Sequence, residues 1–262
     1  MAMLQIAAMK KIVLITGATS GFGKAMAEAF ARAGFDIIIT GRRKERLDAL
    51  QASIESSGQA RCLSLCFDIR DRDACFEAIS SLPADWQPID ILINNAGGAW
   101  GRDRVTDASL DDWEIMMDTN VMGLMYITKA VLPMMTERRQ GHIINIGSIA
   151  GKEPYEFGNG YNAAKFAVEG LSKALRIDLL PFNIKVTHIA PGAAETEFSL
   201  VRFKGDESKA AAIYKGYQPL SAEDVAGIVL YTATLPPHVC INDLVVTPTA
   251  QANSYNIYKS TT

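Results

Sequence analysis

The stretch KIVLITGATSGFGKAMAEAFARAGFDIIIT, residues 11–40, sets the fold that we expect for this chain. Its first six residues form an apolar, β-branched run that ends at glycines, which is typical of a buried strand. Residues 24–33 then repeat apolar side chains at helical spacing, and Gly34 ends that helix. Residues 36–40 form a second apolar run. A strand, a helix and a strand joined by short connections predict the beginning of a parallel sheet.

The same alternation continues along the chain. Further strands are predicted at 62–67, 89–93, 142–146 and 184–189, and helices at 43–57, 71–81, 110–139 and 159–180. Six buried strands separated by helices predict an α/β fold, a doubly wound, Rossmann-like parallel sheet with helices on both faces. An antiparallel α+β fold would need hairpin turns, and no Asn-Gly or Asp-Gly pair lies between paired strands. We expect a single domain over residues 1–262, with residues 1–8 as a disordered extension.

The composition is typical of a globular protein. Hydrophobic residues make up 48% and charged residues 21%, and the net charge of −3 comes without a long run of one sign. This balance argues against a nucleic-acid groove or a polybasic membrane surface. No window approaches the roughly 18 apolar residues of a membrane span. Four cysteines without a CxxC pair and three scattered histidines give no metal-ligand pattern. We therefore expect a cytoplasmic protein with reduced thiols and no metal.

A glycine-rich turn follows the first strand. Thr16 to Gly23 has the pattern T-G-x-x-x-G-x-G, in which glycines let the backbone approach a pyrophosphate at the start of the next helix. Its place between the first strand and the first helix of a βαβ unit favours dinucleotide binding. The residues expected to contact the dinucleotide here are Gly17, Thr19, Ser20, Gly21, Phe22 and Gly23.

Two arginines after the second strand indicate which dinucleotide binds. NAD sites usually place an acid near this point, whereas Arg42 and Arg43 suit the 2′-phosphate of NADP. The alternative is a solvated helix start, where cations are slightly unfavourable. Asp68, at the end of the third strand, is placed to accept a hydrogen bond from the adenine amino group or to cap the next helix. The expected cofactor is NADP.

A tyrosine and a lysine four residues apart are the first catalytic candidates. Tyr161 and Lys165 fall on one helix face, and a nearby cation stabilises phenolate, so that tyrosine can exchange protons with an alcohol or carbonyl oxygen. The spacing alone is weak, since it recurs at Tyr255 and Lys259 in a polar tail with no helical pattern. The first pair follows Ser148, which lies at a strand end thirteen residues upstream and could hydrogen-bond the substrate oxygen.

These motifs together resemble the short-chain dehydrogenase/reductase family. The resemblance rests on TGATSGFG, Asp68, NNAG at 94–97, Asn120, Ser148, the Tyr161/Lys165 pair, and Pro191-Gly192 followed by Thr196, in family order from Lys11 to about Val246. It implies that Tyr161 is the acid/base, that Lys165 also holds the nicotinamide ribose, and that Ser148 orients the carbonyl. Asn120 would hold a water in a proton relay. Further implied cofactor contacts are Asn95, Ala96, Gly97, the backbone near Ile189, Pro191, Gly192 and Thr196.

Four segments are similar to one subgroup of that family, the NADP-dependent serine/3-hydroxy acid dehydrogenases. They are ITGRRKERL, LPADWQPIDILINNAG, GHIINIGSIAG and TEFSLVRFKGD. The resemblance implies oxidation of a β-hydroxy acid such as serine, L-allo-threonine or 3-hydroxypropionate. Gly98-Ala99-Trp100 and Lys152-Glu153 depart from the subgroup, and Trp100 could narrow the pocket. Arg202 is the candidate for binding a substrate carboxylate, with a solvated lid residue as the alternative. Arg102 and Arg104 are weaker candidates.

The sequence thus predicts an NADP(H)-dependent oxidoreductase acting on a small β-hydroxy acid. A broad carbonyl reductase or a 3-oxoacyl reductase is the alternative on the same scaffold, although residues 159–180 form no basic face and the C-terminus lacks an Asp-Gly-Gly ending. A non-catalytic NADPH-binding regulator would predict loss of Ser148, Tyr161 or Lys165. The two long helices carry apolar residues on more than one face, which burial in the monomer or subunit contacts would explain. The family resemblance implies a homotetramer.

Overall fold

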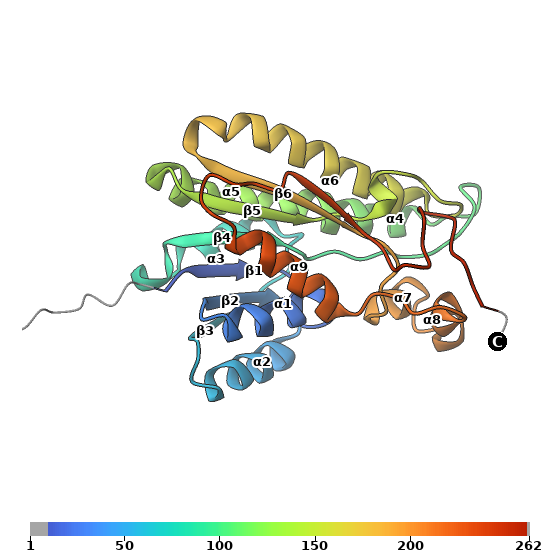
Figure 1. Cartoon of the computed structure of the whole chain (residues 1–262), viewed down its shortest axis with the longest axis horizontal. Coiled ribbons are helices and arrows are strands. Elements are labelled where there is room, and N and C mark those ends of the chain that lie inside the picture. The colour runs from blue at the N-terminus through green and yellow to red at the C-terminus, as the bar shows by residue number, and fades with distance from the viewer. Residues whose placement is uncertain (1–9, 261–262) are drawn as a thin grey trace, which may run out of the picture.

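Seven parallel strands form the centre of the computed structural model, which describes residues 10–260 (Figure 1). Their order across the sheet is β3-β2-β1-β4-β5-β6-β7, and all six neighbouring pairs are parallel. The chain reverses its direction of progress between β1 and β4, which is where doubly wound sheets bind ligands. The strands are β1 Ile12–Ile15, β2 Asp36–Gly41, β3 Cys62–Cys66, β4 Ile89–Asn94, β5 Gly141–Ile146, β6 Ile184–Pro191 and β7 Asp243–Val246.

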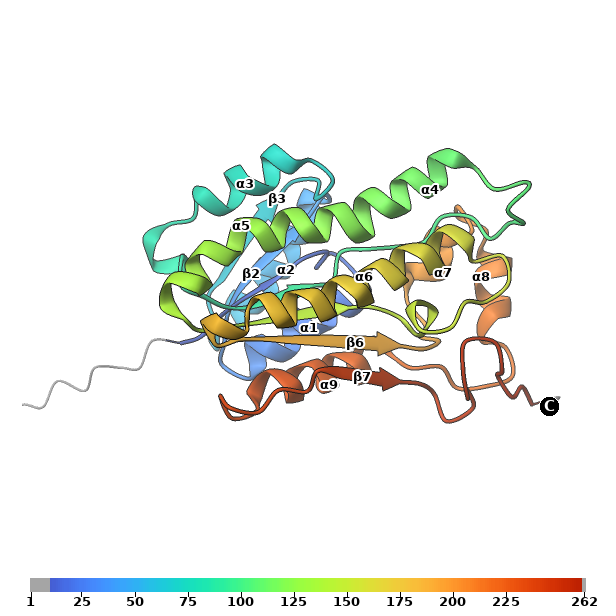
Figure 2. The same cartoon turned by 90° about the horizontal axis from the view of Figure 1, so that it is seen from above.

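Helices cover both faces of the sheet (Figures 1 and 2). One face packs against α1 (Gly21–Arg32), α2 (Lys44–Ser56) and α9 (Ala222–Thr234), and the other against α3 (Arg72–Ser80), α5 (Gly123–Arg138) and α6 (Asn159–Asp178). The α4 helix (Leu110–Met117) precedes α5, while α7 (Glu197–Arg202) and α8 (Glu207–Tyr214) lie beyond the carboxyl ends of the strands. Short 3₁₀ helices span Ala84–Trp86, Ile149–Gly151 and Leu180–Phe182.

The two hydrophobic cores explain the continuous apolar strands. Along β1, Val13 and Ile15 belong to the core under α1 and α9, whereas Ile12 and Leu14 belong to the core under α3 and α5. Successive side chains of a strand point to opposite faces, so a strand covered on both faces needs an apolar residue at every position. All four of these side chains are fully buried or nearly so. The predicted α/β fold is confirmed.

Several elements differ from the sequence predictions. The α1 helix begins at Gly21, three residues before the predicted start. The prediction began too late because glycines, which have low helix propensity, form the first turn. The predicted helix at 110–139 is α4 and α5 joined by a π-helical turn, Asp118–Met122. The β7 strand and the α7, α8 and α9 helices were not predicted. The expected extension, residues 1–8, lies outside the described residues. Within residues 10–260, no helix has the length and apolarity to cross a membrane.

Candidate active site

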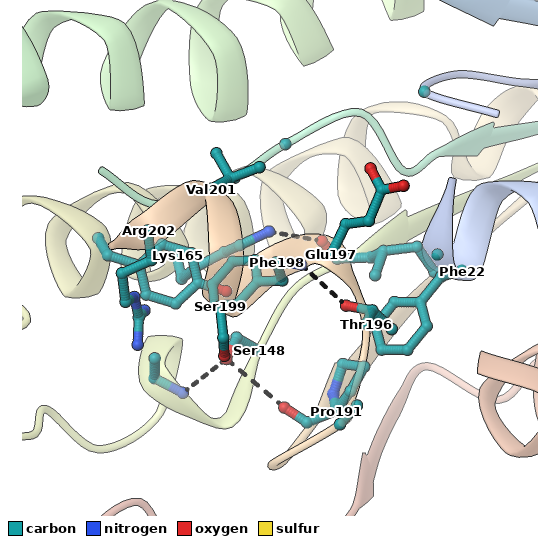
Figure 3. A pocket seen from close by; sticks show the side chains of 18 of the residues that line it. Phe22, Ser148, Lys165, Pro191, Thr196, Glu197, Phe198, Ser199, Val201 and Arg202 are labelled. Carbon is teal, nitrogen blue, oxygen red and sulfur yellow. Dashed lines mark hydrogen bonds between the residues drawn. The ribbon is translucent and has the colours of Figure 1, made fainter. Parts of the chain in front are cut away.

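A cavity of about 740 Å³ opens beyond the carboxyl ends of the central strands. Its walls contain the glycine turn, the ends of β2, β4, β5 and β6, the start of α6, and the segment through α7. Figure 3 labels residues from the glycine turn (Phe22), from α6 (Lys165) and from α7 (Arg202). The position agrees with the rule that ligands bind outside the carboxyl ends of strands at the point where strand order reverses. All of the predicted cofactor residues except Gly23 and Ile189 line this one cavity, together with Ser148, Tyr161 and Lys165.

The glycine turn is packed too closely for side chains. Gly17 has a φ of +67°, and a Cβ there would lie 2.7 Å from the Cα atom of Ala96. A Cβ on Gly23 would lie 2.3 Å from the Gly17 carbonyl oxygen. The Asn95 amide supports the turn by donating to the carbonyl oxygens of Thr16, at 2.8 Å, and Gly17, at 3.2 Å. The first N–H groups of α1 therefore face the cavity without side chains in the way, which suits a pyrophosphate.

The arginines after β2 surround the outer end of this turn. Arg43 donates through Nε to Thr19 Oγ1 at 3.0 Å and through Nη2 to Ser20 Oγ at 2.8 Å. Arg42 Nη1 lies 3.7 Å from Asp68 Oδ2, and the Arg42 side chain is largely exposed. Hydroxyl groups and guanidinium groups that converge beside the glycine turn fit the 2′-phosphate of NADP.

Asp68 is held as a carboxylate. Arg70 donates to both of its oxygens. Although burial favours the neutral acid, the hydrogen bonds from Arg70 and the charge of Arg42 hold the pKa of Asp68 below its ordinary value. The alternative that Asp68 caps α3 is wrong, because the N-cap is Asp71, whose side chain accepts from the Ala74 N–H. Contact with adenine stays a prediction.

Ser148 follows β5 and caps the 3₁₀ helix Ile149–Gly151. Its Oγ accepts from the Ala150 N–H at 3.1 Å and lies 3.5 Å from the Pro191 carbonyl oxygen, a bond drawn in Figure 3. Tyr161 and Lys165 project from α6, where both are buried. The Lys165 ammonium donates to the Ile146 carbonyl oxygen at 2.9 Å and lies 5.7 Å from the centre of the Tyr161 ring. The predicted triad is therefore brought together.

Burial controls the proton affinities of this pair. It raises the pKa of Tyr161 to about 12, while the charge of Arg202 and a hydrogen bond with Ser148 act in the opposite direction. Burial also lowers the pKa of Lys165 to about 8. At neutral pH the tyrosine is thus a protonated phenol and the lysine a cation, the states needed to donate a proton to a carbonyl oxygen and to stabilise the resulting phenolate.

Asn120 lies in the π-helical turn between α4 and α5. Its Oδ1 accepts from the Gly98 N–H at 3.0 Å, and its Nδ2 donates to the carbonyl oxygens of Gly98, at 2.9 Å, and Met116, at 2.8 Å. These bonds explain a buried amide in an apolar helix, since Asn120 fixes the segment that follows β4. The water relay implied by the family resemblance stays a prediction.

Arg202 reaches the catalytic residues from α7. Its guanidinium lies 5.0 Å from the centre of the Tyr161 ring and 4.7 Å from that of Phe198. Its Nη2 donates to Tyr155 Oη at 2.5 Å. Arg102 also lines the cavity, 5.7 Å from the centre of the Tyr155 ring. Arg202 therefore lines the cavity beside Tyr161, and its contact with a substrate carboxylate stays a prediction.

The neighbouring candidates differ in position. Arg104 lies over the ring of Phe157, at 5.8 Å. The indole of Trp100 lines the cavity and packs on Gly98, where a Cβ would lie 3.0 Å from it. Lys152 is held in ion pairs with Asp243, at 2.6 Å, and Glu169, at 3.3 Å. Trp100 can therefore shape the pocket, while Lys152 has a structural function.

Sequence reasoning missed several residues of the site. Tyr155 and Phe198 border Arg202, Glu197 pairs with Arg43, and Gln251 accepts from the Ala193 N–H at 2.7 Å. Tyr155 could have been predicted from the sequence, because it is an aromatic residue between Ser148 and Tyr161. No local pattern in the sequence indicates Gln251. The second tyrosine–lysine pair also lines the cavity, but Lys259 donates to the Ile213 carbonyl oxygen at the end of α8.

Comparison with known proteins identifies the family. Residues 11–206 match the short chain dehydrogenase family, and the chain belongs to it. The chain is 49% identical over 242 residues to the NADP-dependent 3-hydroxy acid dehydrogenase YdfG of Salmonella typhi, covering 92% of this chain and 96% of that one. It is 47% identical over 245 residues to sulfoacetaldehyde reductase 2 of Chromohalobacter salexigens, covering 93% and 96%.

A solved structure supports the same conclusion. The closed form of a serine dehydrogenase complexed with NADP⁺ aligns with a TM-score of 0.88 and 47% identity, covering 95% of this chain and 100% of that one. The predictions of the family, of an oxidoreductase and of NADP as its cofactor are thereby confirmed. The predicted similarity to serine and 3-hydroxy acid dehydrogenases is confirmed as well.

Proposed function

We propose that this enzyme oxidises small β-hydroxy acids, such as serine, L-allo-threonine or 3-hydroxypropionate, at the hydroxyl carbon, and reduces the matching 3-oxo acids. The observation that carries the proposal is the guanidinium of Arg202, which lies 5.0 Å from the centre of the Tyr161 ring. A carboxylate on Arg202 would leave a hydroxyl two carbons away within the reach of the phenol. A guanidinium is the group best suited to bind such a carboxylate.

Tyr161, Ser148 and Lys165 each have a separate role in proton transfer. Tyr161 as phenolate accepts the hydroxyl proton of the alcohol, and as phenol returns a proton to the carbonyl oxygen in the reverse direction. The Ser148 hydroxyl hydrogen-bonds the same substrate oxygen as charge develops on it. Lys165 stabilises the phenolate with its charge, and its ammonium is fixed by the Ile146 carbonyl. The glycine turn and Lys165 would hold NADP(H), which would supply the hydride acceptor for oxidation and the hydride donor for reduction.

A second substrate class is favoured by the charge of the pocket. The guanidinium groups of Arg102 and Arg202 lie 5.7 and 5.5 Å from the centre of the Tyr155 ring. Two cations therefore lie where the acid group of the substrate is expected to bind. A sulfonate would fit the same guanidinium groups as a carboxylate. The similarity to a sulfoacetaldehyde reductase makes sulfoacetaldehyde the alternative substrate.

A substrate panel tests the proposal by absorbance at 340 nm. With NADP⁺, we expect turnover of 3-hydroxypropionate and L-serine to exceed that of methyl 3-hydroxypropionate, the neutral ester. With NADPH, sulfoacetaldehyde is compared with acetaldehyde and with 3-oxoacyl thioesters. Equal rates for acids and neutral compounds would favour a broad carbonyl reductase, preference for thioesters a 3-oxoacyl reductase, and no turnover at all an NADPH-binding regulator.

Assembly and location belong to the same proposal. Met117, Met125 and Phe166, on α4, α5 and α6, expose large apolar surface. Such surfaces support a homotetramer, which light scattering at micromolar concentration would test. All four cysteines are free thiols, including the exposed Cys66, and disulfides are rare in cytosolic proteins. This supports a cytoplasmic location.

A further inference from the structure

Glu197, the first residue of α7, pairs with two arginines at the start of α2: Arg43, the N-cap of that helix, and Arg46. Its Oε2 accepts from Arg43 at 3.0 Å, and its Oε1 accepts from Arg46 at 2.7 Å. Figure 3 shows Glu197 beside Thr196 and on the same side of the pocket as Phe22, away from Ser148. Although its partial burial favours the neutral acid, hydrogen bonds from both arginines hold the pKa of Glu197 below its ordinary value. The carboxylate is therefore charged at neutral pH and lies at the cofactor end of the cavity.

Arg43 is also the cation of the 2′-phosphate pocket. Through Nε and Nη2 it donates to the Thr19 and Ser20 hydroxyls of the glycine turn, and only through Nη1 does it donate to Glu197. A phosphate and the Glu197 carboxylate are both acceptors for the same guanidinium. Because they are also both anions, they compete for Arg43.

The charges around the pocket show why Arg46 matters. Within residues 10–260, the ion pairs of Arg42, Arg43, Arg46 and Arg70 join them to two carboxylates, those of Asp68 and Glu197. The surplus of two positive charges matches the charge of about −1.5 to −2 on a phosphate monoester at pH 7. Without Arg46, the Glu197 carboxylate would have Arg43 as its remaining partner in this cluster.

We propose that Glu197 and Arg46 are specificity-determining residues for the cofactor: Glu197 competes with the 2′-phosphate for Arg43, and Arg46 retains the carboxylate when the phosphate binds. Arg46 thus favours NADP over NAD without contacting the phosphate. NAD has a hydroxyl in place of the phosphate and does not displace the carboxylate. The inference concerns the cofactor alone and does not depend on which alcohol is oxidised.

Calorimetric binding of two half-cofactors to the full-length protein tests this. The probe 2′,5′-ADP carries the 2′-phosphate, and 5′-AMP lacks it. We expect Glu197→Gln to tighten 2′,5′-ADP about twofold to fivefold and Arg46→Gln to weaken it by a similar factor, the range of partly exposed ion pairs. Binding of 5′-AMP should stay within experimental error in both variants. Lys44→Gln is the matched control, since it removes a charge of α2 that pairs with Asp48.

The double variant separates this mechanism from direct contact. If Arg46 acts by retaining Glu197, then Arg46→Gln should weaken 2′,5′-ADP binding very little in a protein that already carries Glu197→Gln. A double-mutant cycle measures this difference. An equal loss in both backgrounds would mean that Arg46 binds the phosphate itself and would overturn the proposal. Weaker 2′,5′-ADP binding by Glu197→Gln would overturn it too, because the carboxylate would then assist the phosphate. Unchanged 2′,5′-ADP binding in every variant would also overturn the proposal, because the contacts of Glu197 would then be surface ion pairs without an effect on the cofactor.

Discussion

Replacing Arg202 with methionine should separate acidic from neutral substrates. The guanidinium packs between the rings of Phe198 and Tyr161, at 4.7 and 5.0 Å. Methionine keeps an unbranched apolar stem for those rings and removes only the charge and the donors. The variant therefore tests recognition of the acid with little change in packing.

The magnitude follows from the bonds that are lost. A hydrogen bond to a charged group contributes about 1.5–3 kcal/mol, and about 1.4 kcal/mol corresponds to a factor of ten. We expect kcat/KM for 3-hydroxypropionate to fall about 10-fold to 150-fold, mainly through KM. The neutral methyl ester should lose less, because it lacks the charge that the guanidinium binds. The loss that both substrates share reports the effect of the Arg202 charge on the pKa of Tyr161.

The assay compares kcat/KM for the acid and its ester by absorbance at 340 nm. Arg104→Met is the matched control, since Arg104 packs on a different ring, that of Phe157. Its kinetic constants should equal those of the wild type. If Arg202→Met loses the same factor with acid and ester, Arg202 supports the structure of the site and the carboxylate-binding argument is refuted.

Three further predictions concern Tyr161, stability at acid pH and Gly147, the residue before Ser148. Tyr161→Phe should lower kcat about 10²-fold to 10⁴-fold while NADPH binding, followed by fluorescence, persists; residual activity above a tenth of wild type would exclude Tyr161 as the acid/base. Burial lowers the pKa of His142 to about 3 from the ordinary 6.5, so the unfolded state takes up the proton first and this group makes stability fall as pH decreases from 6.5 towards 3. His142→Gln should therefore remove a slope of up to about 1.4 kcal/mol per pH unit from urea unfolding measured below pH 6, and an unchanged slope would contradict the burial argument. Gly147→Ala should lower the free energy of unfolding by about 1–3 kcal/mol and remove most of the activity, because its Cβ would lie 2.0 Å from His188 Nε2. Gly227→Ala is the control and should not destabilise the protein, because a Cβ there would have nothing in the described structure within 4 Å. Equal melting temperatures of the two variants would contradict the prediction for Gly147.

The central strands and the tyrosine–lysine pair could be predicted because their signals are local. β1 is apolar at every position since both of its faces are buried. The pair on α6 is four residues apart, a spacing that places both side chains on one face of any helix. β7 could not be predicted in the same way. It has four residues, and they alternate between exposed and half-buried at the sheet edge. α9 did carry a signal, the capping box of Ser221 and Asp224.

The parts of the site that sequence reasoning missed depend on distant contacts. Arg43 and Glu197 are separated by 154 residues, and no period or motif relates them. The family resemblance indicated Asn120 as a relay residue, but its hydrogen-bond partner Gly98 became apparent only from the folded structure. A sequence pattern indicates which residue types are present, whereas the pairing of long side chains depends on the packing of separate elements.

The position of β7 also affects how the chain folds during synthesis. β1 to β4, residues 12–94, can pair early, but β7 joins β6 only when residues 243–246 are available. Parallel strands pair only through distant contacts and therefore fold slowly. A chain that ends before β7 would expose the whole hydrogen-bonding edge of β6, a template for aggregation. It would also lack Gln251, whose side chain accepts from the Ala193 N–H beside the cavity. Prematurely terminated chains should therefore be both inactive and substrates for chaperones or proteases.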